Sequence, residues 1–499
     1  MQKKTAIIIG SGVAGMAIAT RLAIQGFSVK VFERNNYPGG KLSMFEKDDF
    51  RFDAGPSLFT QPQNIEELFK AAGEPMSEYF IYKQVDVACK YFFESGKIVN
   101  AYAGAEAFAN ELQEQTGEVA TALTDYLKRS EKTYNNIGKL FLQHSLHKWD
   151  TWLNKRIVPA FKSLRALYLL STLDEYNRRR FKTPEAVQIF NRYATYNGSN
   201  PYKAPAMLSV IPHLEMNEGT FYPIGGMISV TNALYKLAIK KGVQFFFDSP
   251  VERIIHAEGK ACGVVVDGQN MLANVLVSNA DIYFTYKNLL NNPKRARRVL
   301  KQERSSSALI FYWGINRPLP ELGLHNIFFS KQYKEEFDHI FGTKTLYYDP
   351  TVYINITSKE EAAHAPAGKE NWFVMVNVPA NSGQDWEALV AETRKNILEK
   401  LNRRFGFLIE SFIESETILD PIQIEQKTGS YMGSLYGTSS NSKIAAFLRA
   451  PNFTSSIKNL YCCGGSVHPG GGIPLCLQSA KITAGIIEKD FKKQPAHSH

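Results

Sequence analysis

The chain has 499 residues, of which 44% are hydrophobic and 21% are charged, and its 58 lysines and arginines outnumber its 48 acidic residues by ten. These proportions are those of an ordinary globular protein and exclude a disordered or fibrous chain. No stretch approaches the roughly 18 uninterrupted apolar residues of a membrane-spanning helix. The positive balance leaves three interpretations open, namely a nucleic-acid partner, an anionic membrane surface, or solubility alone.

Cysteine usage and the N-terminus bear on the cellular setting. The five cysteines are scattered without metal-ligand spacing, and the adjacent Cys462 and Cys463 are poorly placed to bond to each other. Lys3 and Lys4 are followed by an apolar run over 6–9 that is too short for a secretory signal. We therefore expect a reduced, cytoplasmic protein with no metal.

The N-terminal segment has the pattern of a dinucleotide-binding βαβ unit. Residues 5–9 are continuously apolar, as in a buried parallel strand, and the loop Gly10-Ser11-Gly12-Val13-Ala14-Gly15 follows. A helix over 14–25 and a strand over 27–32 are predicted next, and Glu33 follows that strand. The glycines let a diphosphate approach the helix N-terminus, and the acid can bind ribose hydroxyls. The segment therefore predicts a dinucleotide site.

Two further glycine turns favour FAD over a nicotinamide cofactor. Arg34 alone would suit the 2′-phosphate of a nicotinamide cofactor, but Pro38-Gly39-Gly40-Lys41 comes next. The segment Phe52-Asp53-Ala54-Gly55-Pro56-Ser57 adds another loop that a ligand could approach closely. Three such loops within 60 residues indicate a long, deeply buried cofactor, although each loop alone could be an ordinary turn.

The next segment is predicted to be helical. Residues 106–140 carry apolar residues at three- and four-residue spacing, and residues 149–181 combine leucine and aromatic residues with lysine and arginine. The second stretch could lie along a bilayer surface with its basic side toward lipid phosphates. It could equally be a packed helix with a solvated basic face. Pro159 predicts a break within it.

From about residue 218 the pattern of the cofactor fold returns, beginning with the turn Tyr222-Pro223-Ile224-Gly225-Gly226. The elements predicted after this turn are a helix over 228–240, strands over 243–247 and 251–257, and a hairpin over 261–277. Six basic residues then cluster between 294 and 304. Without interleaved aromatic residues, this cluster is typical of a solvated helix surface rather than of a nucleic-acid site. Residues 305–440 alternate strand and helix patterns, as expected for a second domain.

The C-terminal block is the second strong cofactor signal. A predicted strand runs into Cys462-Cys463-Gly464-Gly465, a loop spans 467–474, and a helix is predicted over 475–487. Five glycines within the nine positions 464–472 would bring backbone amides against a flat or anionic group. A surface linker would also be rich in glycine, but linkers seldom join a buried strand to an apolar helix.

Taken together, the loop 10–15 with Glu33, the turn 222–226 and the loop 464–474 resemble the bacterial-type carotenoid desaturases of the FAD-dependent amine-oxidase superfamily. The similarity covers essentially the whole chain. The run Tyr196-Asn197-Gly198-Ser199-Asn200-Pro201-Tyr202 is most similar to desaturases that act late in the pathway. Those enzymes act at C-3,4 of 1-hydroxylated acyclic or γ-carotene-like monocyclic substrates.

The resemblance and the placement of the motifs imply an α/β fold with two domains. The predicted domains are a doubly wound, Rossmann-type FAD domain assembled from 1–75, 218–300 and 455–499, and a mixed α+β substrate domain from 76–217 and 301–454 with a helical membrane-facing part. The implied partners are FAD, a lipophilic carotenoid and, peripherally, the inner face of the cytoplasmic membrane. Nucleic acid is not expected as a partner.

The resemblance also implies site residues. The candidate cofactor contacts are Gly10, Gly12, Gly15, Glu33, Arg34, Gly40, Lys41, Leu42, Gly55, Pro56, Ser57, Gly226, Val251, Gly465, Gly472, Ile473 and Pro474. The family often has arginine at position 41, whereas lysine keeps the charge but loses the bidentate geometry. The catalytic candidates are Arg192, Glu215 and His468, and His213 is a further polar candidate. Alternatively, Arg192 and Glu215 form an ion pair and the histidines are structural.

The implied reaction is desaturation by hydride transfer to flavin N5 and proton loss from the neighbouring carbon. Because the intermediate charge would spread over the polyene, no strong base or triad is expected. Alternatives are a phytoene desaturase, or a carotenoid ketolase, polyene isomerase or amine oxidase of the same superfamily. A non-enzymatic isoprenoid-binding protein similar to the Rab GDP-dissociation inhibitors is a third class, against which the three intact glycine loops argue.

Overall fold

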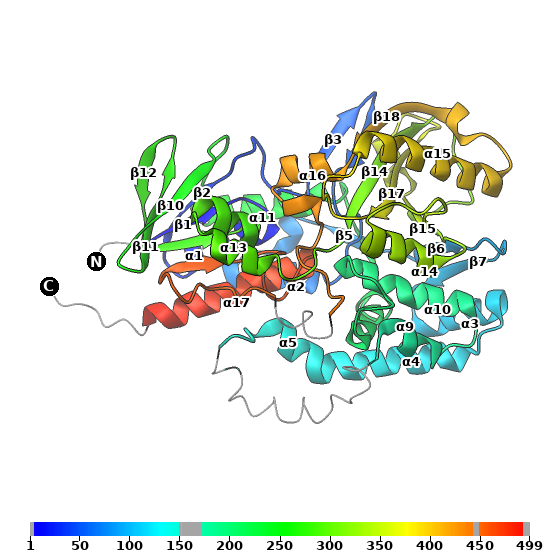
Figure 1. The fold of residues 1–499 in the computed structure, drawn as a ribbon, viewed down its shortest axis with the longest axis horizontal. Coiled ribbons are helices and arrows are strands. Elements are labelled where there is room, and N and C mark those ends of the chain that lie inside the picture. Colours follow the sequence, from blue (N-terminus) through cyan, green and yellow to red (C-terminus); the bar gives the residue numbers. More distant parts are fainter. Residues whose placement is uncertain (1–3, 149–150, 152–170, 443–448, 493–499) are drawn as a thin grey trace.

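The computed structural model describes residues 4–148, 151, 171–442 and 449–492 (Figure 1). The amphipathic stretch predicted over 149–181 lies mostly outside these residues. Every helix within the described ranges is too short or too polar to cross a bilayer.

One part of the molecule is built on a five-stranded parallel sheet. Its strands, in spatial order, are β19 (Leu460–Cys462), β13 (Val275–Ser278), β1 (Thr5–Ile9), β2 (Ser28–Phe32) and β9 (Gln244–Phe246). All neighbouring pairs run parallel. From β1 the chain builds outward to β2 and β9 on one side and to β13 and β19 on the other. This order confirms the predicted α/β class and puts a topological switch point at the carboxyl end of β1.

Both faces of the parallel sheet are covered, which explains its continuously apolar strands. One face packs against the helices α1 (Val13–Ile24), α11 (Ile228–Lys240) and α17 (Ile473–Lys492). The other face packs against the antiparallel strands β10 (Val251–Ala257), β11 (Lys260–Val266) and β12 (Gln269–Leu272).

Two predicted boundaries in this part were wrong. The hairpin predicted over 261–277 comprises only β11 and β12, whereas β13 joins the parallel sheet, where all four of its residues are buried. Helix α17 begins at Ile473 rather than at residue 475, so Ile473 and Pro474 belong to its first turn instead of to the preceding loop.

The second part is built on a seven-stranded mixed sheet, seen at the opposite end of the molecule in Figure 1. Its strands, in spatial order, are β18 (Ile413–Leu419), β14 (Ser307–Ile315), β17 (Glu370–Val378), β16 (Val352–Ile356), β15 (His325–Phe328), β6 (Val87–Phe92) and β7 (Ile98–Tyr102). Neighbours are antiparallel except β15 and β6.

The two faces of the seven-stranded sheet have different cover. One face, with Trp313 and Val374, packs against α15 (Trp386–Phe405). The other face, with Tyr312 and Phe373, packs against the hairpin of β3 (Met44–Lys47) and β4 (Phe50–Asp53). Farther along, that second face meets the helical part formed by α3 (Ala105–Thr116), α4 (Ala120–Thr133), α9 (Leu173–Arg178) and α10 (Pro184–Asn191). The second face therefore looks toward the segment that carries the predicted cofactor loops.

Shorter elements complete the fold. They are α2 (Gln63–Ala72), β5 (Tyr82–Gln84), α5 (Lys139–Gln143), β8 (Phe221–Pro223), α12 (Ile282–Phe284), α13 (Pro293–Val299), α14 (Tyr333–Asp338) and α16 (Pro421–Thr428). All five strands of the parallel sheet lie within 1–75, 218–300 and 455–499, but those ranges as domain boundaries stay a prediction.

Candidate cofactor and substrate site

The first two glycine loops lie against each other at the carboxyl end of β1. Gly12 and Gly39 form an isolated parallel β-bridge, and the N–H of Gly39 donates to the Ser11 carbonyl at 3.0 Å. The hydroxyl of Thr231, on α11, donates to the Leu42 carbonyl at 2.8 Å. The loops are therefore fixed to each other and to a helix that covers the sheet.

Glycine is required where these loops make their closest contacts. A Cβ atom on Gly15 would lie 2.1 Å from the carbonyl oxygen of Gly10, and one on Gly55 would lie 1.8 Å from the carbonyl oxygen of Lys41. In both cases the obstacle is backbone, which cannot move aside as a flexible side chain can. The Gly15 contact lies within the first loop, whereas the Gly12–Gly39 bridge and the Gly55–Lys41 contact join the three N-terminal loops to one another; that a cofactor touches them stays a prediction.

Asn279 links the N-terminal loop to the C-terminal loop. It follows β13, and a Cβ on Gly12 would lie 2.8 Å from its Nδ2 atom, while a Cβ on Gly464 would lie 2.8 Å from its Oδ1 atom. Sequence reasoning assigned Asn279 no role. Its position at the carboxyl end of a parallel strand, next to the switch point, was the signal that could have identified it.

Glu33 is held at the end of β2 beside the first loop. Its Oε2 atom accepts hydrogen bonds from the N–H of Ser11 at 2.7 Å and from the Ser11 hydroxyl at 3.0 Å. The N–H of Ser249 donates to the Glu33 carbonyl at 2.8 Å, which brings the start of β10 at Val251 close to the acid. Glu33 and Val251 therefore lie at the same end of the site.

Lys41 and Arg34 point to different places. The Lys41 ammonium donates to the Leu435 carbonyl at 2.8 Å, and burial lowers the pKa of Lys41 to about 8 even though Asp281 acts in the opposite direction. Arg34 instead donates to the carbonyl of Gln426, on α16, at 2.5 Å in an exposed setting. Lysine at position 41 is thus inside the site, whereas Arg34 lies toward its outer edge.

The C-terminal loop packs onto the start of α17. The N–H of Gly464 donates to the Ser479 hydroxyl at 3.1 Å, and Arg449 donates to the Gly465 carbonyl at 3.4 Å. Gly472 has φ +103° and directly precedes Ile473 and Pro474 in the first turn of the helix. A helix N-terminus of this kind attracts negative charge.

Arg51 and Asp53 form a buried ion pair that sequence reasoning did not assign to the site. The Nη2 atom of Arg51 lies 2.8 Å from Asp53 and donates to the Gly225 carbonyl at 3.0 Å, while Asp53 accepts from the N–H of Met227 at 3.1 Å. A Cβ on Gly226 would collide with Arg51 Nη1 at 2.3 Å. Among the residues that the structure describes, Arg51 Nη1 has no hydrogen-bond acceptor.

These features fit a dinucleotide cofactor. Glycine loops from both chain ends meet beside the switch point, an acid stands at the end of β2, and Arg51 offers a buried N–H group. Ser57 is half-buried next to the loop contact of Gly55, whereas Pro56 between them is exposed. The glycine loops, Glu33 and Lys41 therefore lie in one region, whereas Arg34 and Pro56 lie at its exposed side.

Among the catalytic candidates, Arg192 and Glu215 form a buried ion pair with a separation of 3.1 Å. Arg192 also donates to the hydroxyl of Tyr91 at 2.8 Å, and Glu215 accepts from Tyr193 at 2.9 Å and from Tyr196. The ion-pair interpretation is confirmed, and a catalytic role for either residue stays a prediction.

The two candidate histidines are buried and have partners. His468 Nε2 lies 2.9 Å from the carbonyl oxygen of His144, and burial lowers the pKa of His468 to about 4. His213 Nδ1 lies 2.9 Å from the Asn217 amide nitrogen. Both contacts are those expected of structural histidines, and a catalytic role for His468 stays a prediction.

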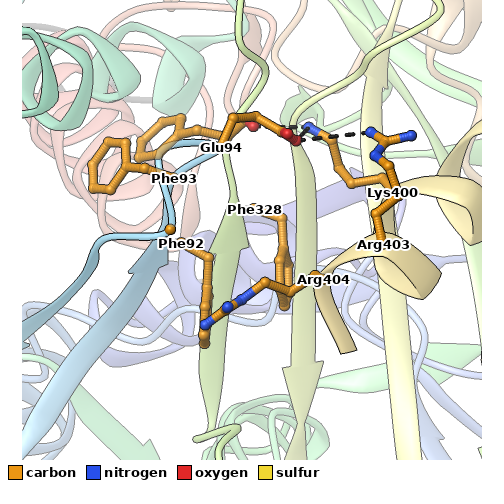
Figure 2. Close-up of a pocket in the computed structure, with 9 residues that line it drawn as sticks. Phe92, Phe93, Glu94, Phe328, Lys400, Arg403 and Arg404 are labelled. Atoms are coloured by element: carbon orange, nitrogen blue, oxygen red, sulfur yellow. Dashed lines mark hydrogen bonds and ion pairs between the residues drawn. The ribbon is translucent and has the colours of Figure 1, made fainter. Parts of the chain in front are cut away.

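A cavity of about 170 Å³ lies elsewhere, between β6, β15 and α15 (Figure 2). In Figure 2 the Glu94 carboxylate points toward Lys400 and Arg403, and Arg404 lies against Phe92. Lys400 is also paired with Asp349 at 2.9 Å. None of the sequence-predicted site residues lines this cavity, so we assign it no role in the site.

Comparison with known proteins decides the family. The model of a family described as flavin containing amine oxidoreductase matches residues 13–487, which include every glycine loop except Gly10 and Gly12 of the first. The chain belongs to this family. Membership explains why loops from both chain ends converge on one site.

Individual proteins of similar sequence or fold add detail to this assignment. The chain is 50% identical over 484 residues to a 1-hydroxycarotenoid 3,4-desaturase of Flavobacterium sp. (strain P99-3), covering 97% of this chain and 99% of that protein. It is 32% identical to a 4,4'-diapolycopene oxygenase of Methylomonas sp, with 97% and 98% covered. The solved structure of wild-type putrescine oxidase bound to putrescine has the same fold, with TM-score 0.63, 15% identity and 98% and 99% coverage.

Replacing Gly15 by alanine tests the backbone contact. We expect purified Gly15→Ala to lose most of its bound flavin, because its Cβ would meet the Gly10 carbonyl. Gly485→Ala is the matched control: this glycine also lies in a helix, but nothing stands within 4 Å of its Cβ position. Flavin absorbance per protein gives the readout and circular dichroism monitors folding. Equal flavin content in the two variants would contradict the assignment.

Proposed function

We propose that the protein is an FAD-dependent carotenoid desaturase that introduces a double bond at C-3,4 of a 1-hydroxylated carotenoid. The observation that carries this proposal is the 50% identity, over 97% of the chain, to a protein named for that reaction. The converging glycine loops and the buried Glu33 support FAD as the particular flavin, because an adenine dinucleotide needs a diphosphate site and a ribose acceptor.

We assign the parts of the cofactor to residues by their order along the site. Glu33 and Val251 would hold the adenosine end, the loop 10–15 the diphosphate, and Gly55, Gly226 and the loop 465–474 the flavin end. Bound FAD would supply the hydride acceptor of the reaction. The chain would orient the substrate, exclude water and hold the cofactor.

Arg192, Glu215 and His468 remain our catalytic candidates. The Arg192–Glu215 pair is neutral overall and is tied to three tyrosine hydroxyls, so it would fix the wall of an apolar site without placing a net charge beside the polyene. In this role the ion pair would orient the substrate and would not remove a proton. This agrees with the expectation that the reaction needs no strong base.

The reaction itself can be read from the product. Purified holoprotein, incubated with an acyclic 1-hydroxycarotenoid, is expected to yield a product that has lost two hydrogen atoms and has a longer conjugated system. Chromatography with mass and absorption spectra measures both changes, with heat-inactivated protein as the control. A product that instead gains oxygen would favour the second candidate, an oxygenase, which rests on the 32% identity to 4,4'-diapolycopene oxygenase.

The lysine at position 41 predicts a pH dependence of cofactor binding. Lys41 is mostly charged at pH 7 and loses its charge as pH rises through its pKa of about 8, so its attraction for the anionic cofactor fades. We expect the dissociation constant for FAD to rise about tenfold, or by 1.4 kcal/mol, between pH 7 and pH 9.5. Lys41→Arg should flatten this profile, since the guanidinium stays charged.

Fluorescence titration of the apoprotein with FAD measures this effect. Lys70→Arg, at an exposed position on α2, is the control and should keep the wild-type profile. If the dissociation constant for FAD rises with pH in the Lys41→Arg variant as much as in the wild-type protein, another group causes the pH dependence.

We further propose that the protein binds peripherally to the inner face of the cytoplasmic membrane. A carotenoid substrate resides in lipid, and the net charge of +10 would favour an anionic bilayer. Flotation with phosphatidylglycerol vesicles at low salt should carry the protein upward, and about 1 M salt should release it, because charges are then screened within about 3 Å. Phosphatidylcholine vesicles are the control. Failure to float with anionic vesicles at low salt would end this proposal.

A further inference from the structure

Two polar residues stand out on the face of the seven-stranded sheet that looks toward the cofactor loops. The register places His325 opposite Asn355, Asn355 opposite Phe373, and Phe373 opposite Tyr312. Directly opposed residues share a face of the sheet. Phe373 and Tyr312 belong to the cluster that includes Phe52 of the β3–β4 hairpin. His325 and Asn355 are thus polar groups at the end of an aromatic row.

A chain of hydrogen bonds connects this pair to the predicted cofactor loop. The Ser57 hydroxyl lies 2.7 Å from the Tyr353 hydroxyl, which in turn lies 2.7 Å from His325 Nδ1. Asn355 Nδ2 lies 3.2 Å from the same nitrogen and donates to the Leu324 carbonyl at 3.0 Å. The imidazole is therefore held on one side from the sheet and from the loop that contains Gly55.

These contacts fix the proton position on the His325 ring. The Leu324 carbonyl can only accept, so the Asn355 atom facing it is the amino group, which can only donate. Facing that amino group, His325 Nδ1 is the unprotonated nitrogen: its one lone pair is shared between the nearer Tyr353 hydroxyl and the more distant Asn355 amino group, and Tyr353 accepts from Ser57. In the neutral ring the single proton consequently lies on Nε2.

The Nε2–H group is a buried donor. His325 is 3% exposed, and no acceptor for Nε2 is found among residues 4–148, 151, 171–442 and 449–492. Burial, together with the nearby positive charge of Arg192, lowers the pKa of His325 to about 3, so the ring is neutral at physiological pH. A buried donor without an acceptor is unfavourable, and an incoming acceptor would remove that cost.

We propose that His325 Nε2 donates a hydrogen bond to the 1-hydroxyl oxygen of the carotenoid and thereby selects hydroxylated substrates. This inference rests on the proposed function. In a 1-hydroxycarotenoid only C-1 and C-2 separate the hydroxyl oxygen from C-3, so its binding group must lie beside the reacting carbons. His325 meets this requirement because its hydrogen-bond chain ends at Ser57, in the loop assigned to the flavin end.

The test compares two substrates on the same enzyme preparation. One is an acyclic 1-hydroxycarotenoid, and the other is the same carotenoid with hydrogen in place of the hydroxyl. We expect the wild-type protein to prefer the hydroxylated substrate in kcat/KM, and His325→Leu to reduce that preference about tenfold or more while retaining activity on the second substrate. Tyr353→Phe, which removes one partner of Nδ1, should reduce the preference less, and it carries the test if His325→Leu does not fold.

Asn326→Leu is the matched control. Asn326 is the next residue of β15, is fully buried and lies on the opposite face, where it donates to the Gly323 and Ile354 carbonyls. This variant should lower the amount of folded protein without changing the preference. An unchanged preference in both His325→Leu and Tyr353→Phe would overturn the inference. A wild-type protein that desaturates neither substrate would instead overturn the proposed function.

Discussion

The glycine loops can meet at the switch point only because no side chain stands between them. Gly12 bridges to Gly39 and Gly55 packs on the Lys41 carbonyl, so the contacts between loops are made by backbone, and Gly15 packs on the Gly10 carbonyl within the first loop. Asn279 then fills the space between the first loop and Gly464. The groups around these loops are built on them: Glu33 accepts from Ser11 of the first loop, Lys41 belongs to the second, and α17 begins directly after Gly472.

The second sheet supplies what the glycine loops cannot, namely a wall of side chains. Its two faces do different work: Trp313 and Val374 anchor α15, whereas Tyr312 and Phe373 face the cofactor segment. An aromatic wall suits a long apolar ligand, but it has no polar group that could distinguish one end of the ligand from the other. The polar end of that wall, at His325, is where such a distinction can arise.

Much of the fold could be predicted from sequence because its signals are local. The glycine motif 10–15 and the helix 228–240 each follow from residues within a few positions of one another. α11 has the predicted bounds, and α1 begins at Val13, one residue before its predicted start, so the motif includes the first turn of that helix. That the hairpin ends after β12 could not be predicted. The sequence of β13 is like that of a hairpin strand, and only its pairing with the distant strands β1 and β19 shows that it belongs to the parallel sheet. The same holds for the site. Glu33 could be predicted from its spacing from the glycines. His325 could not, because its role depends on its contacts with Tyr353 and, through it, with Ser57, which only the tertiary fold brings together.

The strand order of the parallel sheet also has a consequence for biosynthesis. β1 leaves the ribosome long before its neighbour β13, which begins at Val275, and before β19, the outer strand on that side, which begins at Leu460. Until those residues have been synthesised, one edge of β1 has no partner strand, and its apolar side chains, which are buried in the folded protein, are exposed to solvent. Pairing across such distances in sequence is slow, because a long loop must close before any contact forms. Building one site from segments far apart in the sequence therefore leaves an apolar strand edge open during synthesis, and an edge of that kind is prone to aggregation until its partner arrives.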